Sequence, residues 1–438
     1  MSQWMRIFPR LLVLGLLSSG VALSSPRQQA GYDASPINYS RCRPADPVAE
    51  LDRRLASGRT TLKFDDAHGY LKAVLKELDI PCSSQSLVFS KTSFQRQWIS
   101  PRSPRALYFN DDIYLGWVQG GEVLEVASQD PQLGSIFYTM EQETAKPARF
   151  RRQTDNCLQC HDSTGLTLGV PGVTVRSLFA AADGQPRYNM GGFRTTYRSP
   201  FEDRWGGWYV TGTHGEMRHM GNVLFPDDPN PDMKQLRDRG ANLTDLGKRI
   251  EIEPYLTDTS DIVALMVLEY QTAVHNLITR ANHETRVAVA QSDEINRALG
   301  VPQRPLSEGS RRRIGYACEP LLEALLYSEE APLKDAVKGN STFAADFEKR
   351  GPFDRKGRSL RQFDLTKRMF KYPLSYLIYS KAFAGLPPEA RDFVAGRLKV
   401  ILSGADTTGD YAHLTAADRQ AIQEIVADTL PALAAAWK

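Results

Sequence analysis

The chain lacks a strong charge of either sign. Its 438 residues contain 54 Lys and Arg against 51 Asp and Glu, a formal net charge of +3. This balance excludes a strongly basic nucleic-acid-binding protein and implies no bulk electrostatic partner. Beyond its first residues the chain also lacks an apolar run long enough to cross a membrane. We therefore expect no nucleic-acid partner and no stable membrane span in the mature protein.

The short apolar run at the N-terminus has the pattern of a signal peptide. Arg6 and Arg10 form a positive region, residues 11–17 are apolar, and residues 22–24 suit a small-residue cleavage site. No cysteine follows that site, which argues against a lipoprotein. We predict a signal peptide over residues 1–24 and export of the chain, with an uncleaved anchor as the alternative. Cleavage removes two arginines and no acid, so the net charge falls from +3 to +1.

Cysteine and histidine are scarce, with five and seven residues in the chain. Three of them nevertheless fall within residues 157–161, Cys-Leu-Gln-Cys-His. At these frequencies a C-x-x-C-H pattern arises by chance in roughly one of a thousand such chains. The pattern is the attachment signature of haem c, in which the two thiols form thioethers with the porphyrin vinyl groups. The histidine then lies under the ring as an axial ligand of the iron.

Three other interpretations of this motif are open. A thioredoxin-like redox pair needs a buried strand before the motif and a helix after it, but residues 149–156 are too polar for such a strand. A zinc site would use Cys157, Cys160 and His161, but no second C-x-x-C or H-x-x-x-H supplies further ligands. A structural disulfide between Cys157 and Cys160 would leave His161 unexplained.

A loop rich in glycine and proline follows the motif, at Gly165, Gly169, Pro171 and Gly172. Residues 157–179 thereby resemble class I c-type cytochromes. In that family a similar loop passes beside the proximal histidine, where a backbone carbonyl can accept the other imidazole N–H.

The resemblance implies one covalently attached haem c, with Cys157 and Cys160 as its attachment points and His161 as the proximal axial ligand. It also implies that the haem is attached outside the inner membrane, so we expect the protein in the periplasm. A second C-x-x-C-H is absent, which excludes the two-haem peroxidase pattern and a multihaem wire. The motif lies in the middle of the chain, unlike that of small electron carriers, so we expect a large single-haem c-type cytochrome.

Short segments rich in β-branched and aromatic residues predict an antiparallel sheet over residues 86–140. The expected strands are residues 86–90, 106–109, 113–118, 123–127 and 135–139, with a hairpin at Gly120-Gly121. Before them, residues 25–85 form an N-terminal arm and one helix, over residues 64–78. The β-rich region continues to residue 225 and contains the haem segment 157–179. Residues 187–225 read as a strand, a turn and a returning strand.

Residues 226–231, Pro-Asp-Asp-Pro-Asn-Pro, form the clearest linker. Beyond them the period is helical, which predicts a helical domain over residues 232–438. A long helix should begin at Asp258 or Ser260 and run towards Gly300. Further helices are expected at residues 310–327, 373–384, 388–402 and 416–437. The fold class is therefore α+β, with an antiparallel β-rich N-terminal part, an embedded haem c segment and an all-helical C-terminal part.

The distal iron ligand is sought among histidines and methionines that follow the motif. If residues 217–225 form a strand, side chains alternate between two faces, and His219 lies on the apolar one while Met220 lies on the other. We therefore predict His219 as a distal ligand and Met220 as the alternative, with His214 and Met190 behind them. An empty or water-bound sixth position remains the competing interpretation.

Several further residues carry weaker expectations. We predict that Cys42 and Cys82 form a disulfide and leave Cys318 free. A basic stretch before the motif either pairs with the haem propionates or is solvated: Arg149, Arg151 and Arg152. Aromatic residues beside glycines either wall the cofactor or belong to the core: Trp205, Trp208 and Tyr209. His275 and His283, eight residues apart on the long helix, are expected to be satisfied by hydrogen bonds.

Three functions are compatible with these features. The first is an exported single-haem c-type cytochrome that binds haem and transfers one electron at a time with an unidentified redox partner protein in the periplasm. The alternative is a haem c enzyme, peroxidase-like or oxygen-activating, which would explain the large flanking regions. A haem-based sensor or docking subunit is the third. An enzyme or sensor needs an open or displaceable sixth iron position, whereas a simple carrier is six-coordinate.

Overall fold

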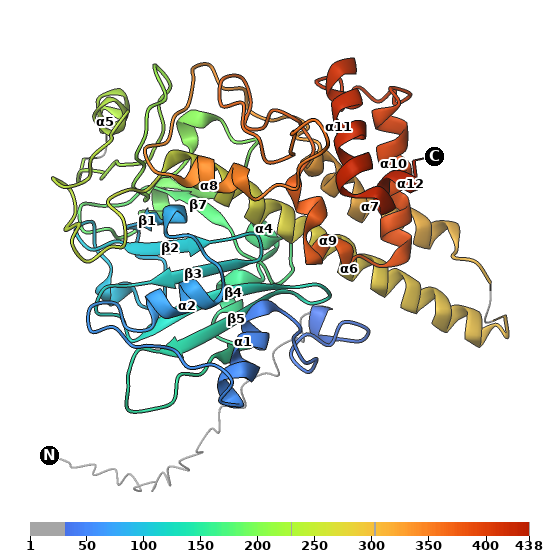
Figure 1. Cartoon of the computed structure of the whole chain (residues 1–438), viewed down its shortest axis with the longest axis horizontal. Helices are drawn as coiled ribbons and strands as arrows, with labels where there is room; N and C mark the ends of the chain where they lie inside the picture. The colour runs from blue at the N-terminus through green and yellow to red at the C-terminus, as the bar shows by residue number, and fades with distance from the viewer. Residues whose placement is uncertain (1–30, 229, 302–303, 438) are drawn as a thin grey trace, which may run out of the picture.

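The protein combines helices with an antiparallel sheet, as a computed structural model shows (Figure 1). The structure describes residues 31–228, 230–301 and 304–437. The predicted signal peptide, residues 1–24, lies outside this part of the chain. The mixed α and antiparallel β composition predicted from the sequence is confirmed.

A six-stranded antiparallel sheet forms the centre of the N-terminal half, with its strands in chain order. The strands are β1 (Ser86–Val88), β2 (Arg105–Phe109), β3 (Ile113–Trp117), β4 (Val123–Asp130), β5 (Gly134–Glu141) and β6 (Arg151–Gln153). All five strands expected from the β-branched and aromatic segments are present, and β3 and β4 are joined through Gly120 and Gly121. β6 was not expected, because its sequence is polar and it lies at the sheet edge.

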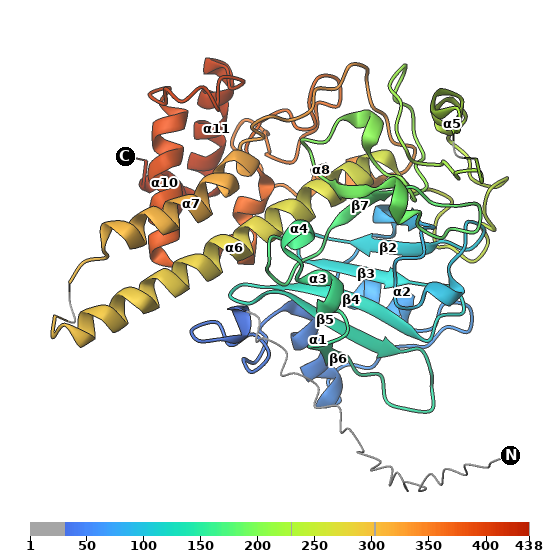
Figure 2. The ribbon, with the colours of Figure 1, turned by 180° about the vertical axis from the view of Figure 1, so that it is seen from behind.

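Both faces of the sheet are covered. Helices α1 (Pro47–Ala56) and α2 (Leu71–Glu77) lie on one face (Figure 1). Seen from behind, the other face carries α3 (Leu158–His161), α4 (Thr164–Thr167) and strand β7 (Val175–Leu178) (Figure 2). β7 pairs with β8 (Gly192–Thr195) in a separate two-stranded sheet. Cover on two sides explains why every residue of β3 is buried.

The remaining helices follow in the second half of the chain. They are α5 (Met233–Gly240), α6 (Ile262–Ala298), α7 (Glu308–Leu325), α8 (Phe343–Lys349), α9 (Lys381–Ala384), α10 (Pro388–Leu402), α11 (Ala416–Thr429) and α12 (Pro431–Ala435). Helices α7, α10 and α11 pack beside α6 on its side away from the sheet (Figure 2). The helices predicted at residues 310–327, 388–402 and 416–437 are thus present, the last one divided at Pro431.

Helix α6 links the two halves of the molecule. Its N-cap Asp261 accepts hydrogen bonds from the backbone N–H groups of Val263 and Ala264, so the long helix begins just after the predicted start at Asp258 or Ser260. Its length and apolar composition would allow it to cross a membrane, but 94% of its most apolar stretch is buried inside the protein. It packs against β5 and β7 on one side and α7 on the other. Buried apolar residues before and after residues 226–231 form one continuous core.

Several local predictions are wrong. Residues 205–225 form turns and isolated bridges rather than a strand and its return, and Trp205 and Asn222 both have φ of +66°. The helix expected at residues 64–78 is confined to α2, and α1 was not expected. Residues 373–384 fold as a short 3₁₀ helix, Tyr376–Tyr379, followed by α9. Cys42 and Cys82 are free thiols and not a disulfide.

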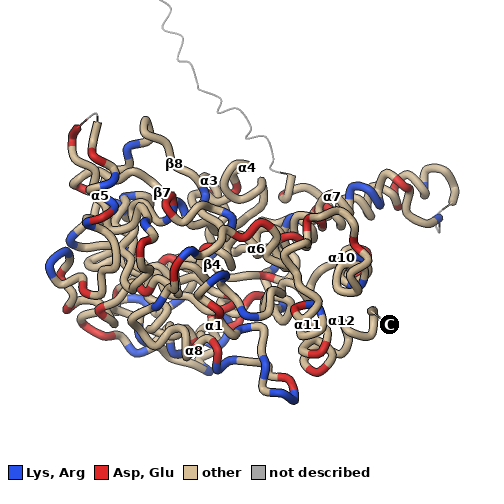
Figure 3. Tube along the Cα trace, turned by 90° about the horizontal axis from the view of Figure 1, so that it is seen from above, with Lys and Arg blue, Asp and Glu red and all other residues tan. Residues whose placement is uncertain are grey.

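Charge is spread evenly over the described residues. Blue Lys and Arg segments and red Asp and Glu segments are interspersed over the described trace, without a large region of one sign in this view (Figure 3). Many of these groups form ion pairs on the surface, such as Arg149 with Asp52 and Arg355 with Asp428. The distribution agrees with the small net charge of the chain.

Candidate haem attachment site

A large cavity lies between the sheet and strand β7. It encloses about 1480 Å³ of space, including solvent at its mouth. Strands β2 to β5 form one wall, and β7 with part of α6 forms the other (Figure 2). Apolar side chains line much of it: Leu107, Ala127, Phe137, Val173, Leu178 and Leu268.

One row of residues runs across the sheet wall of this cavity. Leu107, Gly116, Glu125 and Thr139 form this row across β2 to β5 and all line the cavity. A Cβ atom at Gly116 would lie 3.3 Å from Cδ2 of Leu107 and 3.6 Å from Cδ of Arg105, so the neighbouring side chains already fill the space over the glycine. A larger residue at this position would displace them into the cavity.

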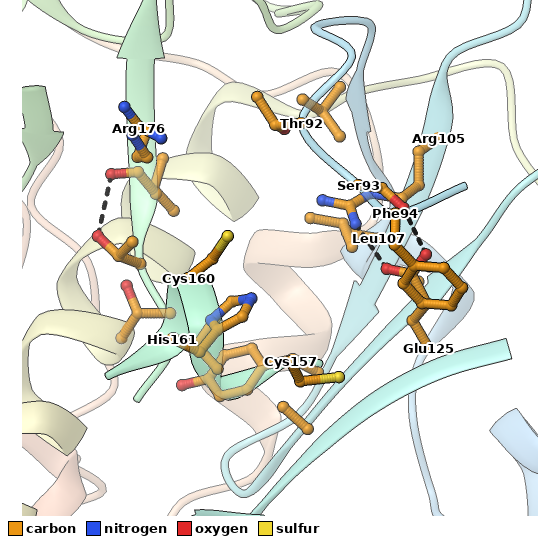
Figure 4. A pocket seen from close by; sticks show the side chains of 18 of the residues that line it. Thr92, Ser93, Phe94, Arg105, Leu107, Glu125, Cys157, Cys160, His161 and Arg176 are labelled. Carbon is orange, nitrogen blue, oxygen red and sulfur yellow. Dashed lines mark hydrogen bonds and ion pairs between the residues drawn. The ribbon is translucent and has the colours of Figure 1, made fainter. Parts of the chain in front are cut away.

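The motif residues 157–161 meet at this cavity. Helix α3 is a single turn, in which the backbone N–H groups of Cys160 and His161 both donate to the carbonyl oxygen of Cys157. This turn brings Cys157, Cys160 and His161 to the cavity wall together. Both thiols are free, Cys157 half-buried and Cys160 exposed. Figure 4 shows the three side chains grouped at the cavity, with the imidazole beside the Cys160 thiol.

The imidazole of His161 is held by the loop that follows it. Its Nδ1 lies 2.9 Å from the carbonyl oxygen of Gly172, and the backbone N–H of Gly172 donates to the carbonyl oxygen of His161 at 2.9 Å. A carbonyl only accepts, so Nδ1 carries the proton and Nε2 keeps a free lone pair. Burial lowers the pKa of His161, which also favours the neutral ring. The predicted bond from the imidazole to a loop carbonyl is confirmed.

The loop itself is anchored to the sheet and to α6. Pro171 accepts a hydrogen bond from the backbone N–H of Ser135 on β5. Asn276 on α6 donates through Nδ2 to the carbonyl oxygen of Val173 at 2.9 Å. On its other side the imidazole packs on Phe137, with the ring centroids 4.8 Å apart. His161 is thus fixed on both sides before any ligand is bound.

A charged pair also lines the cavity. Nη1 of Arg105 on β2 lies 2.8 Å from Oε2 of Glu125 on β4, and both side chains are less than one-fifth exposed. Oε1 of Glu125 accepts two more hydrogen bonds, from Ser93 at 2.5 Å and from Gln95 at 2.8 Å. The carboxylate is therefore firmly held, and the guanidinium lies in a fixed place. Sequence reasoning missed this pair because its members are 20 residues apart on different strands.

Two arginines without acid partners face each other across β7 and β8. Arg176 is directly opposite Arg194, and Arg176 lines the cavity. Among the described residues neither forms an ion pair with a carboxylate, although like charges in opposed positions are destabilising. Burial, together with the charge of Arg198, lowers the pKa of Arg194. An anionic group such as a carboxylate would relieve this repulsion.

The arginines that were considered for the haem propionates lie elsewhere. Arg149 pairs with Asp52, Arg151 lies 3.5 Å from Glu141, and Arg152 donates to backbone carbonyls of Tyr39 and Cys42. None of the three lines the cavity. The interpretation as propionate partners was wrong, and Arg105 and Arg176 are the cavity arginines.

The predicted distal ligands do not reach the cavity either. His219 is buried against Trp205 and His214, with ring centroids 5.4 and 4.7 Å away. Met220 belongs to a small separate apolar cluster, and its sulfur accepts a hydrogen bond from Arg237. The argument from alternation fails because residues 217–225 are not a strand, so that successive side chains can all be buried.

The two further candidates for the distal ligand, His214 and Met190, also lie outside the cavity and have other contacts. Nδ1 of His214 donates to the carbonyl oxygen of Met217 at 2.9 Å, and its Nε2 accepts from the backbone N–H of Asn242. Met190 packs against the same small cluster as Met220. Of the aromatic residues considered as cofactor walls, Trp208 lines the cavity, whereas Trp205 and Tyr209 belong to the core.

The two histidines of α6 are only partly satisfied. Nδ1 of His275 lies 2.7 Å from the hydroxyl of Tyr114, a cavity residue, but its Nε2 has no hydrogen-bond partner among the described residues. Within the described part of the chain, the ring nitrogens of His283 form no hydrogen bond of good geometry, but the backbone carbonyl groups of Gln132 and Leu133 interact with the ring and oppose the lowering of its pKa by burial. The expectation of satisfied helix histidines is therefore half right for His275, and for His283 it is met only by these two backbone interactions.

The other interpretations of the motif find little support. Within the described residues, no three His, Cys, Asp or Glu side chains are grouped as a metal site, which disfavours zinc. The preceding strand β6 is a three-residue edge strand and α3 is one turn, unlike a thioredoxin-like motif. Burial raises the pKa of Cys157 to about 11, the opposite of an activated thiol.

The residues present fit a covalently bound haem. Two free thiols and an imidazole with an available lone pair share one large, mainly apolar cavity. Comparison of the chain with models of protein families, with curated proteins and with solved structures gave no match.

Proposed function

We propose that this protein is an exported, periplasmic single-haem c-type cytochrome that transfers one electron at a time with a redox partner protein. One observation carries the proposal: both thiols of the C-x-x-C-H motif and a neutral imidazole meet at one large, mainly apolar cavity. Bound haem c would supply the one-electron couple. The role of the chain is to attach, orient and shield it.

Each residue of the motif has a separate task in this proposal. Cys157 and Cys160 hold the porphyrin covalently, and His161 offers Nε2 as the proximal ligand. Gly172 fixes the tautomer through its carbonyl oxygen, which also raises the basicity of the ligand. Arg176, which forms no ion pair with a carboxylate among the described residues, is the cavity cation available to a propionate, since guanidinium matches carboxylate geometry.

Covalent attachment is the direct test. The chain is expressed with a haem c maturation system, and bound haem is measured after acid–acetone extraction and as the pyridine haemochrome. The wild type should retain its haem. Cys157→Ser and Cys160→Ser should each lose one thioether, with a shifted haemochrome band, and the double variant should lose all covalent haem.

Cys82→Ser is the matched control, because Cys82 is an exposed free thiol outside the cavity. It should carry haem like the wild type. Complete extraction of haem from the wild-type protein would refute the proposal, and so would a double variant that still holds it covalently.

A haem enzyme or sensor is the second candidate, favoured by a separate observation. No second histidine and no methionine is among the described residues that line the cavity. Electron carriers are normally held six-coordinate by such a ligand, whereas enzymes and sensors keep the position open.

A further inference from the structure

We propose that the iron carried by His161 has no protein ligand on its other side and takes a small exogenous ligand there, with Arg105 as its hydrogen-bond donor. The inference rests on the proposed haem c attachment, and an open position favours the haem enzyme or sensor over the simple electron carrier. It concerns ligands of one to three atoms, neutral or anionic, that can accept a hydrogen bond while bound to the iron.

The first support is the set of side chains that line the cavity. The side chains that usually complete a six-coordinate haem are histidine and methionine. Among the described residues, His161 is the sole histidine at the cavity, and no methionine or lysine reaches it. The four residues that sequence reasoning favoured are packed or hydrogen-bonded elsewhere: His214, His219, Met190 and Met220.

The second support is that most side-chain oxygen atoms on the cavity wall that could bind iron already form hydrogen bonds within the protein. Three lining tyrosine hydroxyls are hydrogen-bonded at 2.6–2.7 Å: Tyr108 to Gln85, Tyr114 to His275 and Tyr138 to Asp46. The carboxylate of Glu125 is occupied by Arg105, Ser93 and Gln95. Tyr188, at the mouth and 63% exposed, is the remaining hydroxyl that needs a direct test.

Arg105 has a fixed position, and some of its N–H groups form no hydrogen bond to the residues that the structure describes. Its Nη1 bonds Glu125, while its buried Nε has no partner within the described part of the chain. A guanidinium carries five N–H groups, so several remain for a second acceptor. Figure 4 shows Arg105, Ser93 and Glu125 together on one side of the cavity and His161 with Cys160 on the other. A polar donor facing the iron-binding imidazole across an apolar space is what a bound small ligand requires.

The charge of the cavity favours neutral or anionic ligands. Arg105 and Arg176 line it, and Glu125 is the sole acidic residue described on its wall. Glu125 is paired with Arg105, so its carboxylate presents no free negative charge to a small anion. A fluoride or cyanide ion can therefore approach the free N–H groups of Arg105.

Ligand binding by the covalently loaded protein tests the proposal. Carbon monoxide is added to the reduced protein and fluoride is titrated into the oxidised protein, both followed by optical spectra. We expect a high-spin ferric spectrum, rapid carbon monoxide binding and a fluoride complex. Arg105→Leu should weaken fluoride binding ten- to a hundredfold, the loss of a hydrogen bond from a charged donor.

Arg151→Leu is the matched control, because Arg151 is an exposed arginine outside the cavity. It should bind fluoride like the wild type. Equal fluoride affinity in Arg105→Leu and Arg151→Leu would overturn the role of Arg105. Tyr188→Phe should leave the ferric spectrum unchanged, and a changed spectrum would identify Tyr188 as a protein ligand and overturn the open position.

The same samples separate this inference from the proposed function. Covalent haem with a low-spin spectrum and no carbon monoxide complex would overturn the open position, while the cytochrome proposal would stand. No covalent haem in the wild type would overturn both.

Discussion

Gly172 illustrates how a single residue can control the orientation of the His161 imidazole. A Cβ atom at this position would lie 2.1 Å from Oδ1 of Asn276 and 3.2 Å from Cβ of Thr167. Asn276 would have to move, although it holds the carbonyl oxygen of Val173. The absence of a side chain at Gly172 therefore maintains the contact between α6 and the loop that fixes His161.

We predict that Gly172→Ala lowers the free energy of unfolding by about 1–3 kcal/mol, the usual range for overpacking a filled site. Gly165→Ala is the control, because a Cβ at Gly165 meets no atom within 4 Å and alanine is favoured in the helix α4. It should be neutral or stabilising. Urea unfolding measures both, and equal stability of the two variants would show that the loop yields easily.

His275 is a single residue that makes the free energy of unfolding depend on pH. Burial lowers its pKa to about 4 from an ordinary value of 6.5, with the charge of Asp111 acting in the opposite direction. The folded state then binds fewer protons than the unfolded state between these two values. The stability contributed by the neutral ring is complete above pH 6.5 and is lost as the pH falls towards 4.

We predict that His275→Gln, which keeps an acceptor for Tyr114 but does not titrate, flattens this dependence. From pH 7 to pH 4.5 the wild type should lose about 2–3 kcal/mol relative to the variant. Urea unfolding at several pH values gives the difference curve. Buried Glu269 and Glu330, whose pKa values burial raises to about 7, act in the opposite direction in both proteins and cancel. Parallel curves would contradict the buried neutral ring.

The motif residues were predictable from sequence, whereas the rest of the site was not. Cys157, Cys160 and His161 lie within five residues, so one turn of helix brings them together without any knowledge of the fold. Arg105 and Glu125 meet only because β2 and β4 flank β3. The position of His219 depends on the turns of residues 205–225. Turns have no regular repeat of side-chain directions, so this position could not be predicted from the spacing of residues.

At the scale of elements, α6 joins the irregular segment 197–225 to the core through one buried ion pair. Arg204 Nη1 lies 2.6 Å from Oε1 of Glu269, and the indole N–H of Trp205 donates to Oε2 at 2.9 Å. Both charged side chains are at most 3% exposed. The guanidinium also donates to the carbonyl oxygens of Tyr197 and Ser199, which ties the loop together.

We predict that Glu269→Ala costs about 3–5 kcal/mol, because it leaves the charge of Arg204 buried and unpaired. The double variant Arg204→Met, Glu269→Met should recover much of this loss, since apolar residues of similar size remove the unpaired charge. Chemical unfolding of the single and double variants is the measurement. A double variant no more stable than Glu269→Ala would mean that the hydrogen bonds, and not the charge, hold the segment.

Strands and long helices were predicted better than the segments between them. The β-branched strands β1 to β5 and helices α6, α7, α10 and α11 have clear periods and clear ends. The segment around Trp205 and Asn222 was misread because its aromatic and branched residues resemble a strand. Its left-handed backbone at these two positions, which only the tertiary contacts explain, prevents one.

At the scale of the whole molecule, the chain composition changes at residues 226–231 but the core does not divide there. Most of the buried apolar residues described between Tyr32 and Val426 form one group, with a small separate cluster around Met220. Helix α6 lies in the middle of that group. Polar α6 residues reach across to the N-terminal half: Glu269 to Arg204, His275 to Tyr114, Asn276 to Val173 and Asn282 to Pro131.

We predict that residues 232–438 alone do not fold, although sequence composition suggests a helical domain with this boundary. Without the N-terminal half, the face of α6 that packs on β5 and β7 is exposed to water, and its buried polar side chains lose their partners. The fragment should lack a cooperative urea transition and slowly exchanging amides. Co-expression of residues 25–225 with residues 232–438 should yield a soluble complex, because the two pieces together contain the continuous core. A fragment that unfolds cooperatively by itself would instead establish two independent domains, with the cavity beside Cys157, Cys160 and His161 belonging to the first and covered by the second.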